Sequence, residues 1–291
     1  EIAQCLVGSE MCIRDSYWNL EPGKGYYTTR NGSSVVAWRV PDHAIGGWRI
    51  VASHSDSPTW KIKTDIVEND GCRRLSVEGY GGMIMSTWLD RPLTVGGRVI
   101  VKTEDGIESR LVCIDRDLLV IPSLAIHFQR DINKGHTFNP QVDMQPLWGP
   151  AGSRTLTDLV AEELGVDTAD ILDSDLQLVT RQAPTQIGPD GEFFMAPRID
   201  DLECAATTLL GFLDAAAETD SACAPVWAML DNEEVGSSSR MGAQSSYLRD
   251  VLDRIVDAIP HSGQAMHRAM ANSFMPVSYT HLRAHETLSD L

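Results

Sequence analysis

The stretch that decides the fold is "APVWAML" at residues 224–230, which runs directly into "DNEEVGSSSRMGAQ" at 231–244. A continuous apolar run bounded by a turn is typical of a strand buried on both faces of a parallel sheet. Glu233 and Glu234 follow the end of that strand. Carboxylates at the end of a buried strand require compensating partners, because an unpaired charge there is costly. The pattern favours a functional sheet edge, and a solvated acidic turn is the alternative.

The neighbouring segments complete an α/β pattern. Two β-branched runs with turn signals between them, 33–41 and 47–56, predict strands. Leucines and alanines at helical spacing predict a helix over 201–218, and a single apolar stripe predicts another over 245–259. The order strand, strand, helix, strand, helix indicates an α/β fold.

The middle of the chain has a different composition. Short strand-like runs separated by Gly and Asp turns occur at 73–79, 97–103 and 109–115, and an amphipathic, capped helix is expected over 155–166. We therefore predict a β-rich domain inserted at 64–190. The α/β domain, with a mixed sheet, is then formed by 17–63 and 191–275.

The two ends, 1–16 and 276–291, show no periodicity that leads into the adjoining elements. Both resemble translated sequencing-adapter sequence, so we expect them to be artefactual tails. His281 and His285 are four residues apart, a spacing that places two imidazoles on one helix face. The metalloprotease pattern requires Glu directly after the first His, whereas here Glu286 follows the second. We expect no metal site in this tail.

Composition excludes several classes of partner. The chain of 291 residues has a formal net charge of −17, which argues against nucleic acid and anionic membranes as partners. No run approaches the ~20 apolar residues of a membrane span. The six cysteines are scattered and form no C-x-x-C pair. This usage argues against a zinc ribbon and suits a reducing cytoplasm.

The first chemical cluster is "SHSDSP" at 53–58. His54 and Asp56 lie at i, i+2, which places them on the same face of an extended chain. Imidazole is a common metal ligand, and a neighbouring carboxylate can hold its second ring nitrogen. A simple surface pair is the alternative.

The second and third clusters supply carboxylates. Asp200, in "APRIDDLE" at 196–203, could bridge two metal ions, or it could simply cap the helix that follows, a role that Asp201 could also take. Side chains of the adjacent Glu233 and Glu234 point in different directions, so one could bind a metal while the other acts as general base. Ligands of α/β sheets bind beyond the carboxyl ends of strands, so the three clusters could converge.

The three clusters, together with "LAIHFQRDIN" at 124–133 and "LEPGKGYYTTRNGSSVVAWRV" at 20–40, resemble the aspartyl aminopeptidase family of dinuclear zinc peptidases. The resemblance covers about 17–275. It implies an α/β zinc-peptidase domain interrupted by an oligomerisation domain. It also implies two Zn²⁺ ions per active site, with Mn²⁺ or Co²⁺ as possible substitutes, and peptide substrates that lose an N-terminal Asp or Glu.

The resemblance also implies a role for each residue. His54 is a terminal zinc ligand, Asp56 orients it, and Asp200 bridges both ions. Glu234 is a ligand of the second zinc. Glu233 is the general base for attack by a zinc-activated water.

The resemblance gives His127 a role that the residues alone do not. On its apolar segment His127 reads as structural, whereas family likeness places it in the inserted domain, reaching into a neighbouring subunit's active site. The expected partners are therefore peptide substrates and further copies of the chain.

The chain also departs from the family pattern. The match ends near Met275, before the downstream Asp and His ligands, so only His54, Asp200 and Glu234 can be placed. We expect this chain to bind zinc weakly or not at all and to be inactive. The alternatives are a related broad-specificity dizinc aminopeptidase or deacylase, and a non-catalytic oligomeric scaffold.

Overall fold

The computed structural model describes residues 9–11, 17–42, 44–69, 71–217, 221–259 and 265–276. The chain forms two compact units, Glu1–Ser57 with Arg198–Leu291, and Pro58–Pro197. The second unit is wider than the insert predicted at 64–190, because the strand that starts at Thr59 and a hairpin that ends at Met195 both belong to it. Below, each unit is described by itself.

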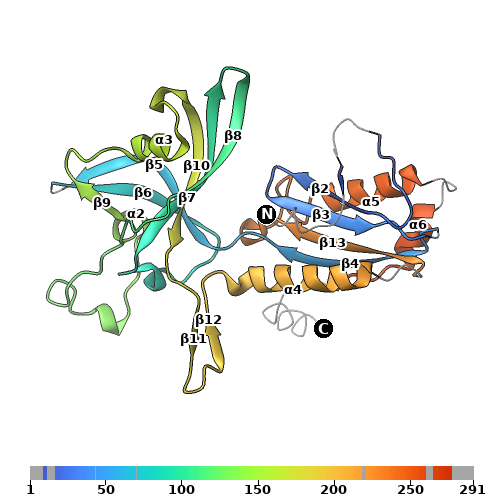
Figure 1. The fold of residues 1–291 in the computed structure, drawn as a ribbon. Helices are drawn as coiled ribbons and strands as arrows, with labels where there is room; N and C mark the ends of the chain where they lie inside the picture. The colour runs from blue at the N-terminus through green and yellow to red at the C-terminus, as the bar shows by residue number, and fades with distance from the viewer. Residues whose placement is uncertain are drawn as a thin grey trace. The chain divides into compact units, whose positions relative to one another are not determined.

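The first unit is built on a mixed five-stranded sheet of order β1-β2-β3-β13-β4 (Figure 1). The strands are β1 (Ser9–Glu10), β2 (Gly25–Arg30), β3 (Ser34–Arg39), β13 (Cys223–Leu230) and β4 (Gly47–His54). The apolar run at 224–230 is a buried strand, as predicted. Its neighbours differ in direction, since β13 pairs parallel with β4 and antiparallel with β3.

Helices cover both faces of this sheet, as the alternating pattern predicts (Figure 1). Phe212 of α4 (Ile199–Ala216) packs with Trp227 on one face. Tyr247 and Ile255 of α5 (Tyr247–Ala258) join the core on the other face. No helix in the described part of the chain is long and apolar enough to cross a membrane.

The outer edge of β4 receives the chain after α6 (Ala265–Ala271). The backbone N–H of Phe274 donates to the carbonyl of Trp48 at 3.0 Å, and the N–H of Ile50 donates to the carbonyl of Phe274 at 3.0 Å. These bonds form a parallel bridge between Arg49 and Phe274. The chain therefore returns to the sheet beside β4 and heads toward the end that carries His54.

The second unit contains a six-stranded antiparallel sheet of order β8-β7-β10-β5-β6-β9. Its strands are β5 (Thr59–Asn69), β6 (Cys72–Tyr80), β7 (Leu93–Thr103), β8 (Gly106–Cys113), β9 (Leu147–Pro150) and β10 (Ile171–Thr180). A short hairpin, β11 (Thr185–Ile187) with β12 (Phe193–Met195), completes the unit's strands. The three strand-like runs predicted in this region are confirmed as β6, β7 and β8.

One longer helix closes the core of this unit. In α3 (Leu156–Leu164), Thr155 and Asp158 form a capping box, and Leu159 packs in the core with Trp60 and Leu75. The remaining helical segments are α2 (Pro140–Asp143) and the single 3₁₀ turns η1 (Met85–Trp88), η2 (Ile132–Lys134) and η3 (Thr168–Asp170); in the first unit η4 (Glu233–Val235) follows β13.

Candidate metal centre

A histidine and several carboxylates meet where β4 and β13 end. The two strands run parallel with His54 opposite Leu230, so the segments that follow them leave the sheet at the same edge. The backbone N–H groups of Glu233 and Glu234 donate to the two carboxylate oxygens of Asp56, at 3.1 and 3.2 Å. Asp56 thereby fixes the turn after β13 against the turn after β4.

The His54 ring is buried and held through one nitrogen. Its Nδ1 lies 3.0 Å from the backbone carbonyl oxygen of Asp56 and 3.4 Å from the Asp56 carboxylate. Its Nε2 lies 3.3 Å from Oδ1 of Asp200. This arrangement keeps Nδ1 on Asp56 and directs Nε2 toward the carboxylates of α4.

The start of α4 differs from the predicted helix cap. The N-cap position is Arg198, in a left-handed conformation, and no side chain caps the helix. Asp200 and Asp201 have non-helical backbone angles, and the peptide bond between them is cis. Asp201 is buried, and its Oδ2 accepts a hydrogen bond from the backbone N–H of His54 at 2.9 Å. The sequence allows either aspartate to cap this helix; in the structure the N-cap position is Arg198, and the Asp201 carboxylate contacts β4.

Two overlapping sets of donor atoms could hold a metal ion. His54, Asp200 and Asp201 form one set, and His54, Glu233 and Glu234 form the other. Within each set, the potential ligand atoms lie within 4.8 Å of one another. Imidazole nitrogen and carboxylate oxygen are donors that zinc accepts, so these residues fit a zinc ion. Asp201 belongs to this constellation, and the only sequence signal for it is the Asp-Asp doublet.

The charges of the cluster shift the pKa values of His54 and Glu234. Burial opposes the charging of His54, but the hydrogen bond to Asp56 and the charges of Asp201 and Glu233 outweigh it and raise the His54 pKa to about 9. Burial also raises the pKa of Glu234 to about 7, and its neighbouring carboxylates add to this effect against the attraction of His54. Without a metal, the imidazolium of His54 is therefore the counter-ion of the cluster at neutral pH.

Three further histidines lie in the motifs noted in the sequence, His127, His281 and His285. His127 belongs to the second unit, in an exposed turn flanked by the exposed apolar side chains of Ile126 and Phe128. His281 and His285 lie outside the described residues. Among the described residues, neither donor set contains His127.

An α/β domain with a histidine and several carboxylates at the ends of parallel strands has the features of a metal-dependent hydrolase. Residues 8–285 match the family Aminopeptidase I zinc metalloprotease (M18), and the chain belongs to this family. The predicted family resemblance is confirmed. The match is longer than the expected 17–275 and extends into both end segments.

Known relatives agree in sequence and in fold. The chain is 39% identical over 269 residues to the "Probable M18 family aminopeptidase 2" of Clostridium novyi (strain NT), covering 89% of this chain and 61% of the relative. The structure of Chaetomium thermophilum mApe1 has a TM-score of 0.84 at 33% identity, covering 93% of this chain and 67% of that one. The S. cerevisiae mApe1 dodecamer has a TM-score of 0.78 at 27% identity, with 94% and 64% covered. The chain thus spans about three fifths of its curated relative's length.

Proposed function

We propose that the complete polypeptide is a zinc-dependent aminopeptidase that removes N-terminal residues, preferentially Asp and Glu, from peptides. The observation that carries this proposal is the convergence of His54 with the carboxylates of α4 and of the turn after β13. Membership of a zinc metalloprotease family with relatives called aminopeptidases supports it. The acidic preference comes from the family resemblance alone.

Each residue of the cluster has a proposed task. His54 would hold one zinc ion, Glu234 would hold the second, and Asp200 would contribute its carboxylate to both. Asp56 holds the His54 ring and the Glu233–Glu234 turn together, which its hydrogen bonds support. When bound, zinc supplies a Lewis acid that polarises the peptide carbonyl and lowers the pKa of water. Mn²⁺ or Co²⁺ could replace it.

Glu233 is the proposed general base. It follows the strand end directly, and its carboxylate lies in the same donor set as His54 and Glu234. A carboxylate oxygen of Glu233 takes a proton from the attacking water and then delivers it to the nitrogen of the leaving amine. No redox step is involved, and the proton is conserved over the cycle.

The described residues by themselves form only a weak zinc site in our proposal. The two donor sets share one imidazole, that of His54, and the Asp200 side chain is 55% exposed, so water competes for that ligand position. We therefore expect the chain as given to be inactive. Isothermal titration of this chain should show no tight binding of two zinc ions. Two tight sites would contradict the proposal.

We also propose that the polypeptide associates with copies of itself through the second unit and acts in the cytoplasm. The dodecamer of S. cerevisiae mApe1 supports self-association. Around His127, Leu124, Ile126 and Phe128 are exposed apolar side chains that a neighbouring subunit could cover. His127 would then act near the scissile carbonyl in that neighbour's site. Cys72, Cys113 and Cys223 remain thiols, as a reducing compartment requires.

The test uses the complete polypeptide and three anilide substrates, of Asp, Glu and Leu. We expect hydrolysis of the acidic anilides, and loss of hydrolysis in Glu233→Gln with unchanged assembly. Glu203→Gln is the matched control, because Glu203 is an exposed glutamate of α4 outside both donor sets.

Each other outcome identifies an alternative. Equal hydrolysis of all three anilides would favour a broad-specificity dizinc enzyme. Assembly without any hydrolysis would favour a scaffold. Full activity in Glu233→Gln would exclude Glu233 as the base.

A further inference from the structure

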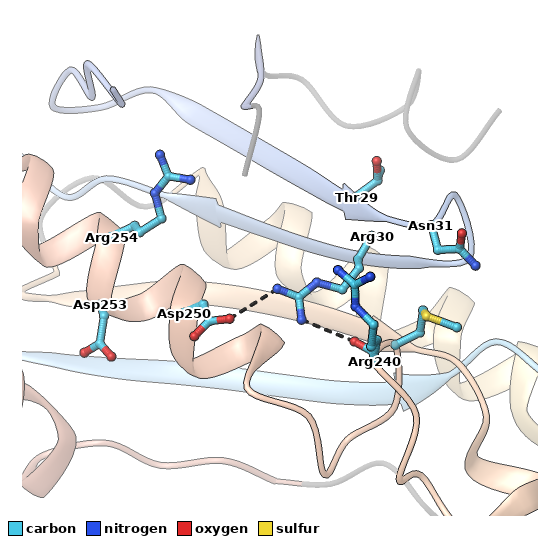
Figure 2. Close-up of a pocket in the computed structure, with 8 residues that line it drawn as sticks. Thr29, Arg30, Asn31, Arg240, Asp250, Asp253 and Arg254 are labelled. Atoms are coloured by element: carbon cyan, nitrogen blue, oxygen red, sulfur yellow. Dashed lines mark hydrogen bonds and ion pairs between the residues drawn. The ribbon is translucent and has the colours of Figure 1, made fainter. Parts of the chain in front are cut away.

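A cavity of about 770 Å³ lies in the first unit, and its lining shares no residue with the two donor sets. It is formed by the β2–β3 turn, the loop after β13 and helix α5 (Figure 2). Its lining comprises Thr29, Arg30, Asn31, Arg240, Met241, Asp250, Asp253 and Arg254. Three arginines against two aspartates give the wall a positive balance, in a chain whose net charge is −17.

Arg30 is held rigidly in this wall. Its guanidinium lies over the ring of Tyr247, 4.3 Å from the ring centroid. It pairs with Oδ2 of Asp250 at 3.2 Å and donates to the backbone carbonyl of Arg240, also at 3.2 Å. Figure 2 shows both of these contacts as dashed lines. One side of the cavity is therefore preorganised.

Arg240 offers the donors that are available to a ligand. Its backbone is fixed, because Arg30 bonds its carbonyl and the hydroxyl of Ser34 donates to the carbonyl of Met241 at 2.9 Å. Its side chain is exposed, and the structure shows no ion pair of its guanidinium within the described residues. A guanidinium presents a planar fork of N–H donors that matches carboxylate and phosphate oxygens.

The two carboxylates of the wall already have partners. Asp250 accepts from Arg30 and from the hydroxyl of Ser246, at 2.7 Å for the latter. Asp253 pairs at 2.8 Å with Arg249, which does not line the cavity. The third arginine, Arg254, is placed at the wall by stacking 4.2 Å over the ring of Trp18. Both negative charges are thus largely offset by arginines.

We propose that this cavity binds a small oxyanion, a dicarboxylate or a phosphate, with Arg240 as the principal ligand-binding residue. Like charges around one cavity repel each other, and a bound anion relieves that repulsion. A volume of about 770 Å³ is in the range of small-molecule sites. The proposal does not depend on the aminopeptidase function, since it uses none of the metal-binding residues.

The test titrates the metal-free chain with succinate and with inorganic phosphate in separate calorimetric experiments, at an ionic strength held constant with chloride. We expect saturable binding of one molecule per chain for at least one of the anions. Arg240→Gln should weaken it about tenfold, the effect of losing one charge-assisted contact. Arg116→Gln is the matched control, because Arg116 is an exposed arginine of the second unit, and it should leave binding unchanged.

A second variant, with the opposite expected effect on anion affinity, makes the test more specific. Asp253→Asn removes a negative charge from the wall and should strengthen binding of the same anion. Preference for succinate identifies a carboxylate ligand, and preference for phosphate identifies a phosphate ligand. The proposal is overturned if neither anion binds saturably, or if Arg240→Gln binds as tightly as the unchanged chain.

Discussion

The two units of the molecule treat buried polar groups in different ways. At the sheet edge of the first unit, His54 is 4% exposed and Asp201 is 1% exposed. In the second unit, the buried polar side chains of the described residues are Thr59 and Thr94. Each of these threonines donates its hydroxyl hydrogen bond to a backbone carbonyl, at 2.7 and 2.6 Å respectively.

This difference indicates that the sheet edge of the first unit has a binding role, whereas the core of the second unit serves stability. A buried hydroxyl with a hydrogen-bond partner costs little, so these two threonines need no further partner. Buried charges are expensive unless they are compensated, and the carboxylates around His54 are compensated by backbone N–H groups and by the His54 imidazolium. Proteins accept such costs mainly at functional sites. A bound cation could take over the compensating role.

The largest expected effect is on the core of the second unit. Leu75 is fully buried there, so Leu75→Ala should lower the free energy of unfolding by about 3 kcal/mol, through lost burial and the cavity left behind. Zinc affinity should stay unchanged. Urea denaturation and zinc titration measure the two quantities. Leu111→Ala, at a site 75% exposed, is the control with little expected effect on stability. A large loss of zinc affinity in Leu75→Ala would break the comparison.

The next effect concerns the metal centre. His54 belongs to both donor sets, so His54→Ala should weaken zinc binding by about a hundredfold or more, beyond what loss of an outer-shell partner costs. Competition with a coloured chelator can measure this. His136→Ala, in the second unit, should bind zinc as the unchanged chain does. Equal losses in both variants would place the metal elsewhere.

Much of this arrangement is predictable from local sequence. Apolar runs and helical stripes specify the strands and helices, and two parallel strands bring His54 and Glu233 to one edge. Asp201 shows the limit of that reasoning. Either aspartate of a doublet can cap a helix, and only the contact with the His54 backbone decides otherwise.

Features assembled from distant segments leave no local signal. The boundary of the second unit follows from the pairing of strands β5 and β6. Sequence composition does not locate that boundary to within one residue. The arginine cavity combines Arg30, Arg240 and Arg254, which lie on a hairpin, a loop and a helix. Their spacing in sequence matches no motif, and their proximity is a property of the tertiary fold.

A smaller effect is expected from pH. At neutral pH, zinc must displace the proton of His54, because the pKa of His54 is about 9. Zinc binding also requires the ionised form of Glu234, whose pKa is about 7. Zinc affinity should therefore rise about tenfold per pH unit between these two values. Competition titrations across that range provide the measurement, and a flat profile would show that His54 does not lose a proton on binding.

The stability of the metal-free chain should change in the opposite direction. The folded-state pKa of His54 lies above its unfolded value of 6.5, so its stabilisation is complete below 6.5 and is lost as pH rises through about 9. The pKa of Glu234 is also raised, from 4.5 to about 7, so its contribution to stability is likewise lost as pH rises through this range. The urea midpoint should fall with pH over these windows. His54→Ala should remove the fall in the upper window.

The smallest effect is expected for Asp56→Asn. An amide retains one oxygen acceptor but replaces the other with an N–H donor, so one of the backbone N–H groups of Glu233 and Glu234 loses its partner. Zinc affinity should fall about tenfold, the usual cost of an altered outer-shell partner. Loss of the Asp56 charge should also lower the pKa of His54, and histidine NMR titration can detect this. Asp105→Asn, in an exposed turn of the second unit, makes the same chemical change and should alter neither quantity. If Asp56→Asn shifted the His54 pKa but left zinc affinity intact, Asp56 would stabilise only the metal-free sheet edge. The first unit would still differ from the second in its buried charges, but that difference would not contribute to metal binding.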